Sequence, residues 1–450
     1  MKKLHKRLIS VTIATLMAIS SALPILSSAA SDVKVSGNWS YRIEDNGTAT
    51  IVDFSQMASA PVVTDVVVPD TLGGAAVTNI GDSAFANEVA VVTVTMPDTV
   101  TAIGDKAFYN CNSMTAIEFS DNLQTMGDSA FSLCYNVSAF NLPNGLQFIG
   151  DSCFADCTFE DIELPDTVTA IGDYAFIRCQ NLKEVALPDS ITDMGIGLFS
   201  RCDALQNVVL PAGLTEIPAE TFFACKTMKS YIIPEGITAI GDKAFNGCTW
   251  LTSVSIPDTV TTIGQYAFAY SGLTSVSLPD SVTSLGNSAF QFCMDLTDVS
   301  LSQNLTTVPI SAFRSCYNLR EIILPQGITN INSKAFASCF LLGRVIVQSN
   351  DVTVAEDAFE GSSGQVEAPV MMSASPVMQQ VAANYTYVSL EADGTLWGDL
   401  TGDFETDLLD TMALAHEAAT GTANLTYDYN NDERVNVLDV MSLAMYLVGR

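Results

Sequence analysis

Two stretches near the C-terminal end place oxygen-bearing side chains at the spacing of a calcium-binding loop. They run over residues 399–410 and 428–439, and in both the oxygen donors fall at loop positions 1, 3, 5, 9 and 12. A hard cation such as Ca²⁺ takes about 6–8 oxygen ligands, and such a loop adds the backbone carbonyl of position 7. That carbonyl belongs to Glu405 in the first stretch and to Arg434 in the second. The spacing therefore predicts two calcium sites.

Each stretch leads into a short amphipathic segment that is followed by glycine, a helix stop signal. The segments cover residues 411–420 and 440–448, and the two copies lie 29 residues apart. The alternative is an acidic turn and helix that binds no metal. The duplication in register favours calcium.

Groups suited to catalysis are sparse. The chain has only two histidines, His5 and His416, whereas Ser-His-Asp and Cys-His sites need one beside a nucleophile. Trp250 and Tyr231 could stack on sugars, although aromatic residues at their positions more often pack between repeats. Paired carboxylates could hydrolyse a glycoside, but the candidates on exposed strands lie in separate repeats: Glu118, Glu184, Asp298 and Glu321. We therefore predict no catalytic residues.

A repeat of about 23 residues must position everything upstream of the calcium loops. Self-similarity at such a period is typical of a solenoid. The marker is the phenylalanine of a recurring Ala-Phe-like pair, with ten steps of 23 residues and two of 22. It occurs at Phe85, Phe108, Phe131, Phe154, Phe176, Phe199, Phe222, Phe245, Phe268, Phe290, Phe313, Phe336 and Phe359.

Each repeat predicts a short strand, a turn and a short helical segment that carries the phenylalanine. Strands such as residues 252–256 alternate, so Val254 and Ile256 are expected to point inward while Ser253 and Ser255 line an exposed parallel sheet. A glycine usually lies four residues before the phenylalanine, which suggests a turn that other residues would strain. Stacking of the repeats then builds one continuous core.

Ten of the eleven cysteines lie three residues after a repeat phenylalanine, and Cys153 is the exception. Equivalent positions of stacked repeats point the same way, which suits a column of buried thiols rather than disulfides.

The ends of the chain differ from the repeat. Residues 1–30 combine a basic start, an apolar stretch and small residues at a cleavage site, which indicates a secretory signal peptide. Its removal takes away Lys2, Lys3, Lys6 and Arg7 and changes the formal net charge from −31 to −35. Such a charge makes nucleic acid and membrane surfaces poor partners.

Segments that flank the repeats are expected to cap the solenoid. A β-hairpin with an Asn-Gly turn is predicted within residues 31–60. A C-terminal cap and linker are predicted over residues 362–394, with a strand near Val366, a helix near residues 375–384 and a strand over residues 385–390.

The repeat units resemble the BspA-like leucine-rich repeats of bacterial surface and secreted proteins. The resemblance covers residues 61–361 and is carried by units such as residues 237–248, Ile-Thr-Ala-Ile-Gly-Asp-Lys-Ala-Phe-Asn-Gly-Cys. It implies an α/β solenoid with a parallel sheet on one face that binds a protein or glycan.

Residues 395–450 resemble a type-I dockerin, a small all-α module that binds the cohesins of a cellulosome scaffold. The resemblance implies two Ca²⁺ ions, one held by Asp399, Thr401, Asp403, Glu405, Asp407 and Asp410 and the other by Asp428, Asn430, Asp432, Arg434, Asn436 and Asp439. It also implies a cohesin-binding surface made of Leu408, Leu409, His416, Glu417, Val437, Leu438, Met445 and Tyr446.

The sequence as a whole predicts a secreted, extracellular, cellulosome-associated binding protein rather than an enzyme. Two alternatives stay open. One is a carbohydrate-active enzyme with an unplaced carboxylate site, and the other is a protein that inhibits or positions other enzymes of the complex.

Overall fold

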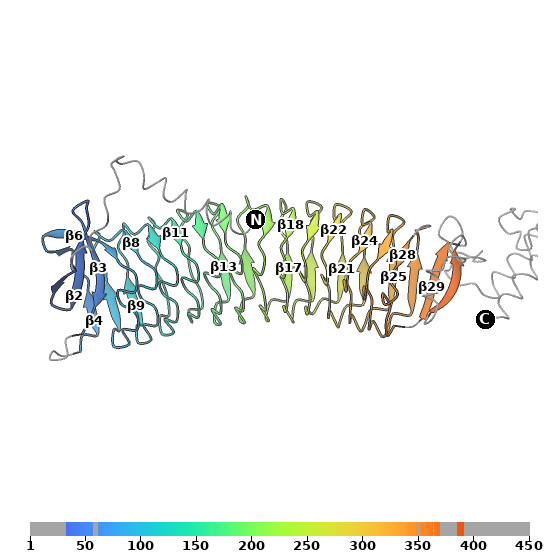
Figure 1. The fold of residues 1–450 in the computed structure, drawn as a ribbon, viewed down its shortest axis with the longest axis horizontal. Coiled ribbons are helices and arrows are strands. Elements are labelled where there is room, and N and C mark those ends of the chain that lie inside the picture. The colour runs from blue at the N-terminus through green and yellow to red at the C-terminus, as the bar shows by residue number, and fades with distance from the viewer. Residues whose placement is uncertain (1–32, 57–61, 350–351, 363, 370–384, 391–450) are drawn as a thin grey trace, which may run out of the picture.

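The computed structural model describes residues 33–56, 62–349, 352–362, 364–369 and 385–390. They form an elongated solenoid in which each repeat is one coil, and the coils follow one another along a single axis (Figure 1). None of these residues forms a helix long and apolar enough to cross a membrane.

Two stacks of parallel strands run along the solenoid, and they appear as two rows in Figure 1. The long-strand stack lies just before the proline of most repeats, and Ser120 and Ser302 replace that proline in two of them. Its members are β4 (Asp65–Val67), β7 (Thr93–Thr95), β9 (Ala116–Glu118), β13 (Glu184–Ala186), β15 (Asn207–Val209), β17 (Ser230–Ile232), β19 (Ser253–Ser255), β21 (Ser275–Ser277), β23 (Asp298–Ser300), β25 (Glu321–Leu324), β27 (Arg344–Val347), β29 (Gly364–Pro369) and β30 (Tyr385–Leu390).

The short-strand stack comes next in each coil, immediately before the phenylalanine segment. Its members are β6 (Ala75–Ile80), β8 (Ala102–Ile103), β10 (Thr125–Met126), β11 (Phe148–Ile149), β12 (Ala170–Ile171), β14 (Asp193–Met194), β16 (Glu216–Ile217), β18 (Ala239–Ile240), β20 (Thr262–Ile263), β22 (Ser284–Leu285), β24 (Thr307–Val308), β26 (Asn330–Ile331) and β28 (Thr353–Val354). The prediction of a sheet on one face alone was therefore incomplete.

The predicted helical segments are turns, and no helix occurs among the described residues. Lys243 and Gly247, two residues before and after Phe245, have positive φ angles of 57° and 76°, which a right-handed helix does not allow. The Phe245 N–H donates to Ala267 O of the next coil at 2.7 Å, instead of to a carbonyl four residues back. Bonding between coils thus replaces helical bonding.

The recurring glycine before each phenylalanine segment is required by a close approach between coils, not by its φ angle. A Cβ on Gly127 would lie 2.6 Å from Gly104 C and 2.7 Å from Asp105 N of the preceding coil. The prediction that a special turn explains this glycine was wrong, because its φ angle is not positive.

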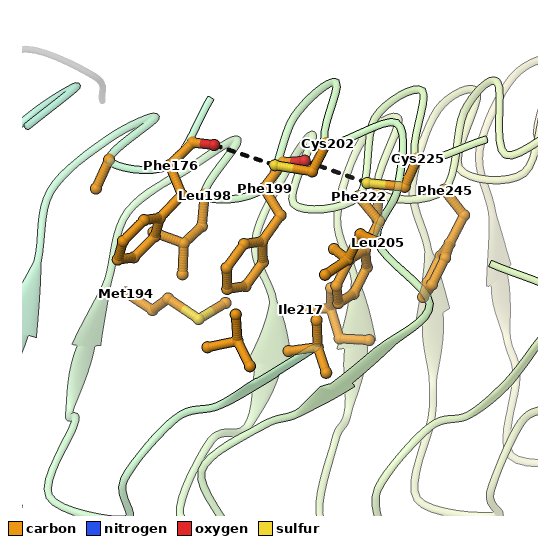
Figure 2. Packing of buried hydrophobic residues seen from close by; sticks show 14 of the residues in the cluster. Phe176, Met194, Leu198, Phe199, Cys202, Leu205, Ile217, Phe222, Cys225 and Phe245 are labelled. Carbon is orange, nitrogen blue, oxygen red and sulfur yellow. Dashed lines mark hydrogen bonds between the residues drawn. The ribbon is translucent and has the colours of Figure 1, made fainter. Parts of the chain in front are cut away.

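The core is a continuous column of phenylalanine rings. Phe245 and Phe268 have centroids 5.2 Å apart and rings inclined by 4°, and the same stacking joins Phe176 and Phe199 in Figure 2. Aliphatic side chains of both strand stacks, such as Ile217, fill the remaining interior. Burial of one ring per coil makes each coil depend on its neighbours.

All eleven cysteines are free and buried, as predicted for the ten in register. Those in register also form a hydrogen-bonded ladder: the Cys202 thiol donates to Phe176 O at 3.1 Å, and the Cys225 thiol donates to Phe199 O at 3.2 Å (Figure 2). In one coil Ser362 replaces the cysteine, and its hydroxyl donates to Phe336 O.

The predicted hairpin is present at the N-terminal end. Strands β2 (Trp39–Ile43) and β3 (Ala49–Phe54) pair antiparallel, and β3 also pairs with β6 of the first coil. Two further strands, β1 (Lys34–Ser36) and β5 (Thr71–Leu72), extend this end. The hairpin therefore covers the first coil, as expected of a cap.

At the other end, the predicted strands near Val366 and over residues 385–390 are β29 and β30, which continue the long-strand stack beyond β27. The helix predicted near residues 375–384 lies outside the described residues.

Candidate binding surface

From β4 to β25, the long-strand stack presents every second side chain toward solvent. On β19, Ser253 and Ser255 are exposed while Val254 turns toward the core, which confirms the predicted alternation. Because neighbouring strands lie about 4.8 Å apart, outward side chains of equivalent register form columns along the solenoid, with one residue per coil. We call this surface the outer face.

A shallow groove of about 750 Å³ lies on the outer face over β21, β23 and β25. Seven of its ten lining residues are polar, although apolar atoms make up more of its surface than polar atoms do, and the residues come from three successive coils. The lining residues are Ser275, Val276, Ser277, Thr297, Asp298, Val299, Ser300, Arg320, Glu321 and Ile323.

Polar contacts within and beside the groove hold its charged side chains in place. Thr297 Oγ1 donates to Asp298 Oδ2 at 2.6 Å. Arg344, on the next coil, forms an ion pair with Glu321 at 2.9 Å. Both pairs remain partly open to solvent, so they position the carboxylates and contribute only about 0–1 kcal/mol to stability.

An edge of apolar residues, exposed except for the half-buried Tyr317, borders this part of the outer face. Met294, Tyr317 and Phe340 occupy the same register on successive turns that lead directly into β23, β25 and β27. The Tyr317 and Phe340 rings stack with centroids 5.1 Å apart. Leu341 and, farther toward the N-terminus, Trp250 are also exposed. We call these five residues the apolar edge.

The structure brings together two of the four carboxylates considered from the sequence. Asp298 and Glu321 lie on neighbouring coils and both line the groove. Glu118 on β9 and Glu184 on β13 lie on distant coils, and neither lines the groove. Of the two aromatic candidates, Tyr231 is core: its hydroxyl donates to Val208 O, and its ring packs between Phe222 and Phe245. Trp250 remains accessible.

The thiols are unsuited to act as nucleophiles, because only the thiolate reacts. Burial raises the pKa of Cys111 to about 12, and it does the same for Cys248. Reactive cysteines instead have a lowered pKa and lie near cations or helix N-termini.

The predicted calcium ligands and cohesin-binding residues all lie within 399–446, outside the described residues. They remain predictions. Within the part of the chain that is described, no group of three or more His, Cys, Asp or Glu side chains is arranged to hold a metal ion.

Sequence reasoning missed the groove and most of the apolar edge. A signal for the edge was present four residues after the repeat phenylalanine. The four coils before Met294 carry Asp203, Lys226, Thr249 and Gly272 there, whereas the next three successive coils carry Met294, Tyr317 and Phe340. Alignment of the repeats by register reveals this change of character.

Comparison with known proteins supports the repeat assignment. The family model described as the BspA type leucine-rich repeat region matches in six copies, over residues 63–162, 147–273 and 238–365. A search of curated proteins gave no match.

Solved structures share the fold. A leucine-rich repeat protein from Bacteroides ovatus is 26% identical, with a TM-score of 0.65 over 79% of this chain and 99% of that chain. The pneumococcal vaccine antigen PcpA is 18% identical, with a TM-score of 0.52 over 80% and 99%. A leucine-rich cell surface protein from Faecalibacterium prausnitzii is 29% identical, with a TM-score of 0.48 over 82% and 99%.

Proposed function

The chain belongs to the BspA-type leucine-rich-repeat family, and from that premise we propose that it is a secreted, non-catalytic protein that binds a protein or glycan through its outer face. The observation that carries this proposal is the outer face itself. Its strands repeat one alternation of exposed and inward-facing side chains from coil to coil. The exposed residues are serines on β19 and β21 and include Val209 on β15 and Ile232 on β17. Extended repeat surfaces of this kind provide many equivalent contacts rather than one reaction centre.

The second part of the proposal concerns attachment. Residues 1–30 direct secretion, and residues 395–450 dock onto a cohesin of a cellulosome scaffold when two Ca²⁺ ions order them. The support is the duplicated pattern of oxygen donors that begins at Asp399 and Asp428. Because metal binding to such loops is coupled to folding, docking would depend on calcium.

A pull-down with the mature chain, residues 31–450, tests this attachment. Culture supernatant that contains cohesin-bearing scaffolds is incubated with the immobilised chain, once in CaCl₂ and once in EDTA. We expect scaffold capture in calcium only. A variant that ends at residue 394 serves as the control and should capture no scaffold in either buffer. Capture that persists in EDTA, or with the shortened variant, contradicts calcium-dependent docking.

One observation favours a second candidate, a glycoside hydrolase. Asp298 and Glu321 face the same groove from neighbouring coils, whose spacing of about 4.8 Å is near the ~5–5.5 Å between the carboxyl groups of retaining enzymes. Release of new reducing ends from plant polysaccharides, abolished in Asp298→Asn and Glu321→Gln, would support hydrolysis. The non-catalytic proposal predicts that the intact chain releases none.

A further inference from the structure

We propose that the groove and the apolar edge together bind a neutral polysaccharide in an extended conformation. This inference rests on the proposed function and assigns the ligand class and its position, the coils that carry β19, β21, β23, β25 and β27. The groove supplies polar groups from three coils, and the edge supplies apolar surface from the turns that lead into the same strands.

The repeat distance suits a chain of sugars. Equivalent residues of neighbouring coils lie about 4.8 Å apart, which is close to the length of one pyranose residue in an extended glycan. Successive coils can therefore present equivalent groups to successive sugars. The volume of about 750 Å³ falls within the ~300–1,000 Å³ typical of small-ligand sites, and the open ends of a shallow groove allow a longer chain to continue.

The lining chemistry suits hydroxyl groups. Each sugar hydroxyl both donates and accepts hydrogen bonds. Ser275, Ser277 and Ser300 can do either, Asp298 accepts, and Arg320 donates. Arg320 and the ion-paired Arg344 offset the carboxylates of Asp298 and Glu321, so the groove has no net positive charge to attract a polyanionic glycan. The formal net charge of −31 makes binding of such a glycan costly for the chain as a whole. A neutral glycan avoids that cost.

The apolar edge suits the C–H faces of pyranose rings. Phe340 and Trp250 are 59% and 57% exposed, large values for aromatic side chains in a chain whose repeat phenylalanines are buried. In the coil after Trp250, a Cβ on Gly272 would lie 2.3 Å from the Thr249 carbonyl oxygen. The glycine at this position therefore places no side chain there. Contact with an apolar ligand face removes the accessible surface of these exposed aromatic rings from water, which stabilises the complex.

The backbone of the groove favours a glycan over an extended peptide. Peptides that bind to sheets commonly add a strand to an open edge. Here β21 pairs with β23 and β25 pairs with β27, while β23 lies beside β25 without ladder hydrogen bonds. Every strand of the groove floor therefore has a neighbouring strand on each side, which leaves no room for an added strand. Side chains carry the recognition, and a ligand rich in hydroxyl groups matches them.

Affinity electrophoresis of the mature full-length chain tests the proposal, with barley β-glucan as the neutral probe and polygalacturonate as the anionic probe. We expect retardation by β-glucan and none by polygalacturonate. Glu321→Gln, Phe340→Ala and Trp250→Ala should each weaken β-glucan binding by about tenfold, with circular dichroism and the melting temperature unchanged because all three side chains lie at the surface.

Two matched controls separate this site from the rest of the outer face. Glu184→Gln changes the residue of the same register as Glu321 on the distant strand β13, and Tyr135→Ala changes an exposed aromatic residue of the same register as Phe340. Both should bind β-glucan like the parent. Absence of retardation, equal losses in test and control variants, or binding of polygalacturonate alone overturns the proposal.

If the glycan site is disproved, the proposed function still holds provided that the outer face binds a protein. A protein ligand whose binding is weakened by Glu184→Gln and not by Phe340→Ala would uphold the proposed function and still overturn the glycan site.

Discussion

At the scale of single residues, the glycine that follows the short strand is the most restrictive position of the coil. A side chain at Gly127 has no space, because backbone atoms of the preceding coil lie within 2.6–2.7 Å of the position a Cβ would take. Backbone cannot move aside as a flexible side chain can. The contact between this glycine and the backbone of the preceding coil therefore sets the distance between coils.

We predict that Gly127→Ala lowers the free energy of unfolding by about 1–3 kcal/mol, the range for overpacking of a dense interior. Chemical denaturation measures it. Gly213→Ala is the matched control, since a Cβ there meets nothing within 4 Å and the φ angle is not positive; it should be neutral or slightly stabilising. Equal effects of the two substitutions would show that coil spacing does not depend on this glycine.

The sequence predicts these residue-scale features unevenly. The spacing of Phe245 and its equivalents correctly predicts stacked coils, and alternation such as Ser253-Val254-Ser255 correctly predicts the outer face. The short helical segments were predicted wrongly, although Lys243 and Ala244 each favour a helix. Hydrogen bonds to the next coil override that propensity, and left-handed residues such as Lys243 and Ser288 carry no glycine signal that would reveal them.

At the scale of elements, the solenoid needs a cover where the ring column begins. The hairpin β2–β3 provides it: the Trp39 ring lies 4.9 Å from Phe54 and 6.0 Å from Phe85, the first ring of the repeat column. The hairpin also pairs with the short-strand stack through β6. The ring column thus ends under a half-buried tryptophan rather than in water.

We predict that Trp39→Ala destabilises the N-terminal coils by about 2–4 kcal/mol, slightly below the range for a fully buried aromatic residue. Hydrogen exchange should then speed up over residues 49–110 and stay unchanged over residues 300–347, because each coil contacts only its neighbours. Trp250→Ala removes an exposed indole and should change neither region. Faster exchange along the entire solenoid would contradict nearest-neighbour stabilisation.

The groove could not be predicted from the sequence, because its residues come from separate strands. Its lining comes from three coils, and Ser277, Ser300 and Ile323 are ordinary strand residues when read one repeat at a time. Only the parallel register that aligns β21 with β23 places them together.

At the scale of the whole molecule, the thiol ladder makes the stability of many coils depend on pH. Burial raises the pKa of Cys293 and Cys339 to about 12 from an ordinary value near 9. The folded chain therefore keeps these protons at a pH where the unfolded chain loses them. Stability is fully present below about pH 9 and falls as pH rises toward 12, by up to ~1.4 kcal/mol per pH unit for each such thiol.

We predict that the urea midpoint of the reduced protein is the same at pH 7.5 and 8 and falls steeply between pH 9 and 10.5. Circular dichroism with a reductant present measures it. Cys248→Ser removes one titrating group, and Ser362 shows that serine can fill this register, so the fall should be less steep in that variant. A midpoint independent of pH up to 10.5 would contradict the buried free thiols.

We propose that this solenoid binds a glycan without cleaving it, and size-exclusion chromatography with light scattering measures both properties in one experiment. The mature chain is incubated with barley β-glucan for a day, and the mixture is separated. We expect the protein to co-elute with the glycan and the molar mass of the glycan to stay unchanged. Protein that elutes alone would contradict glycan binding, and glycan of lower molar mass would contradict the non-catalytic function.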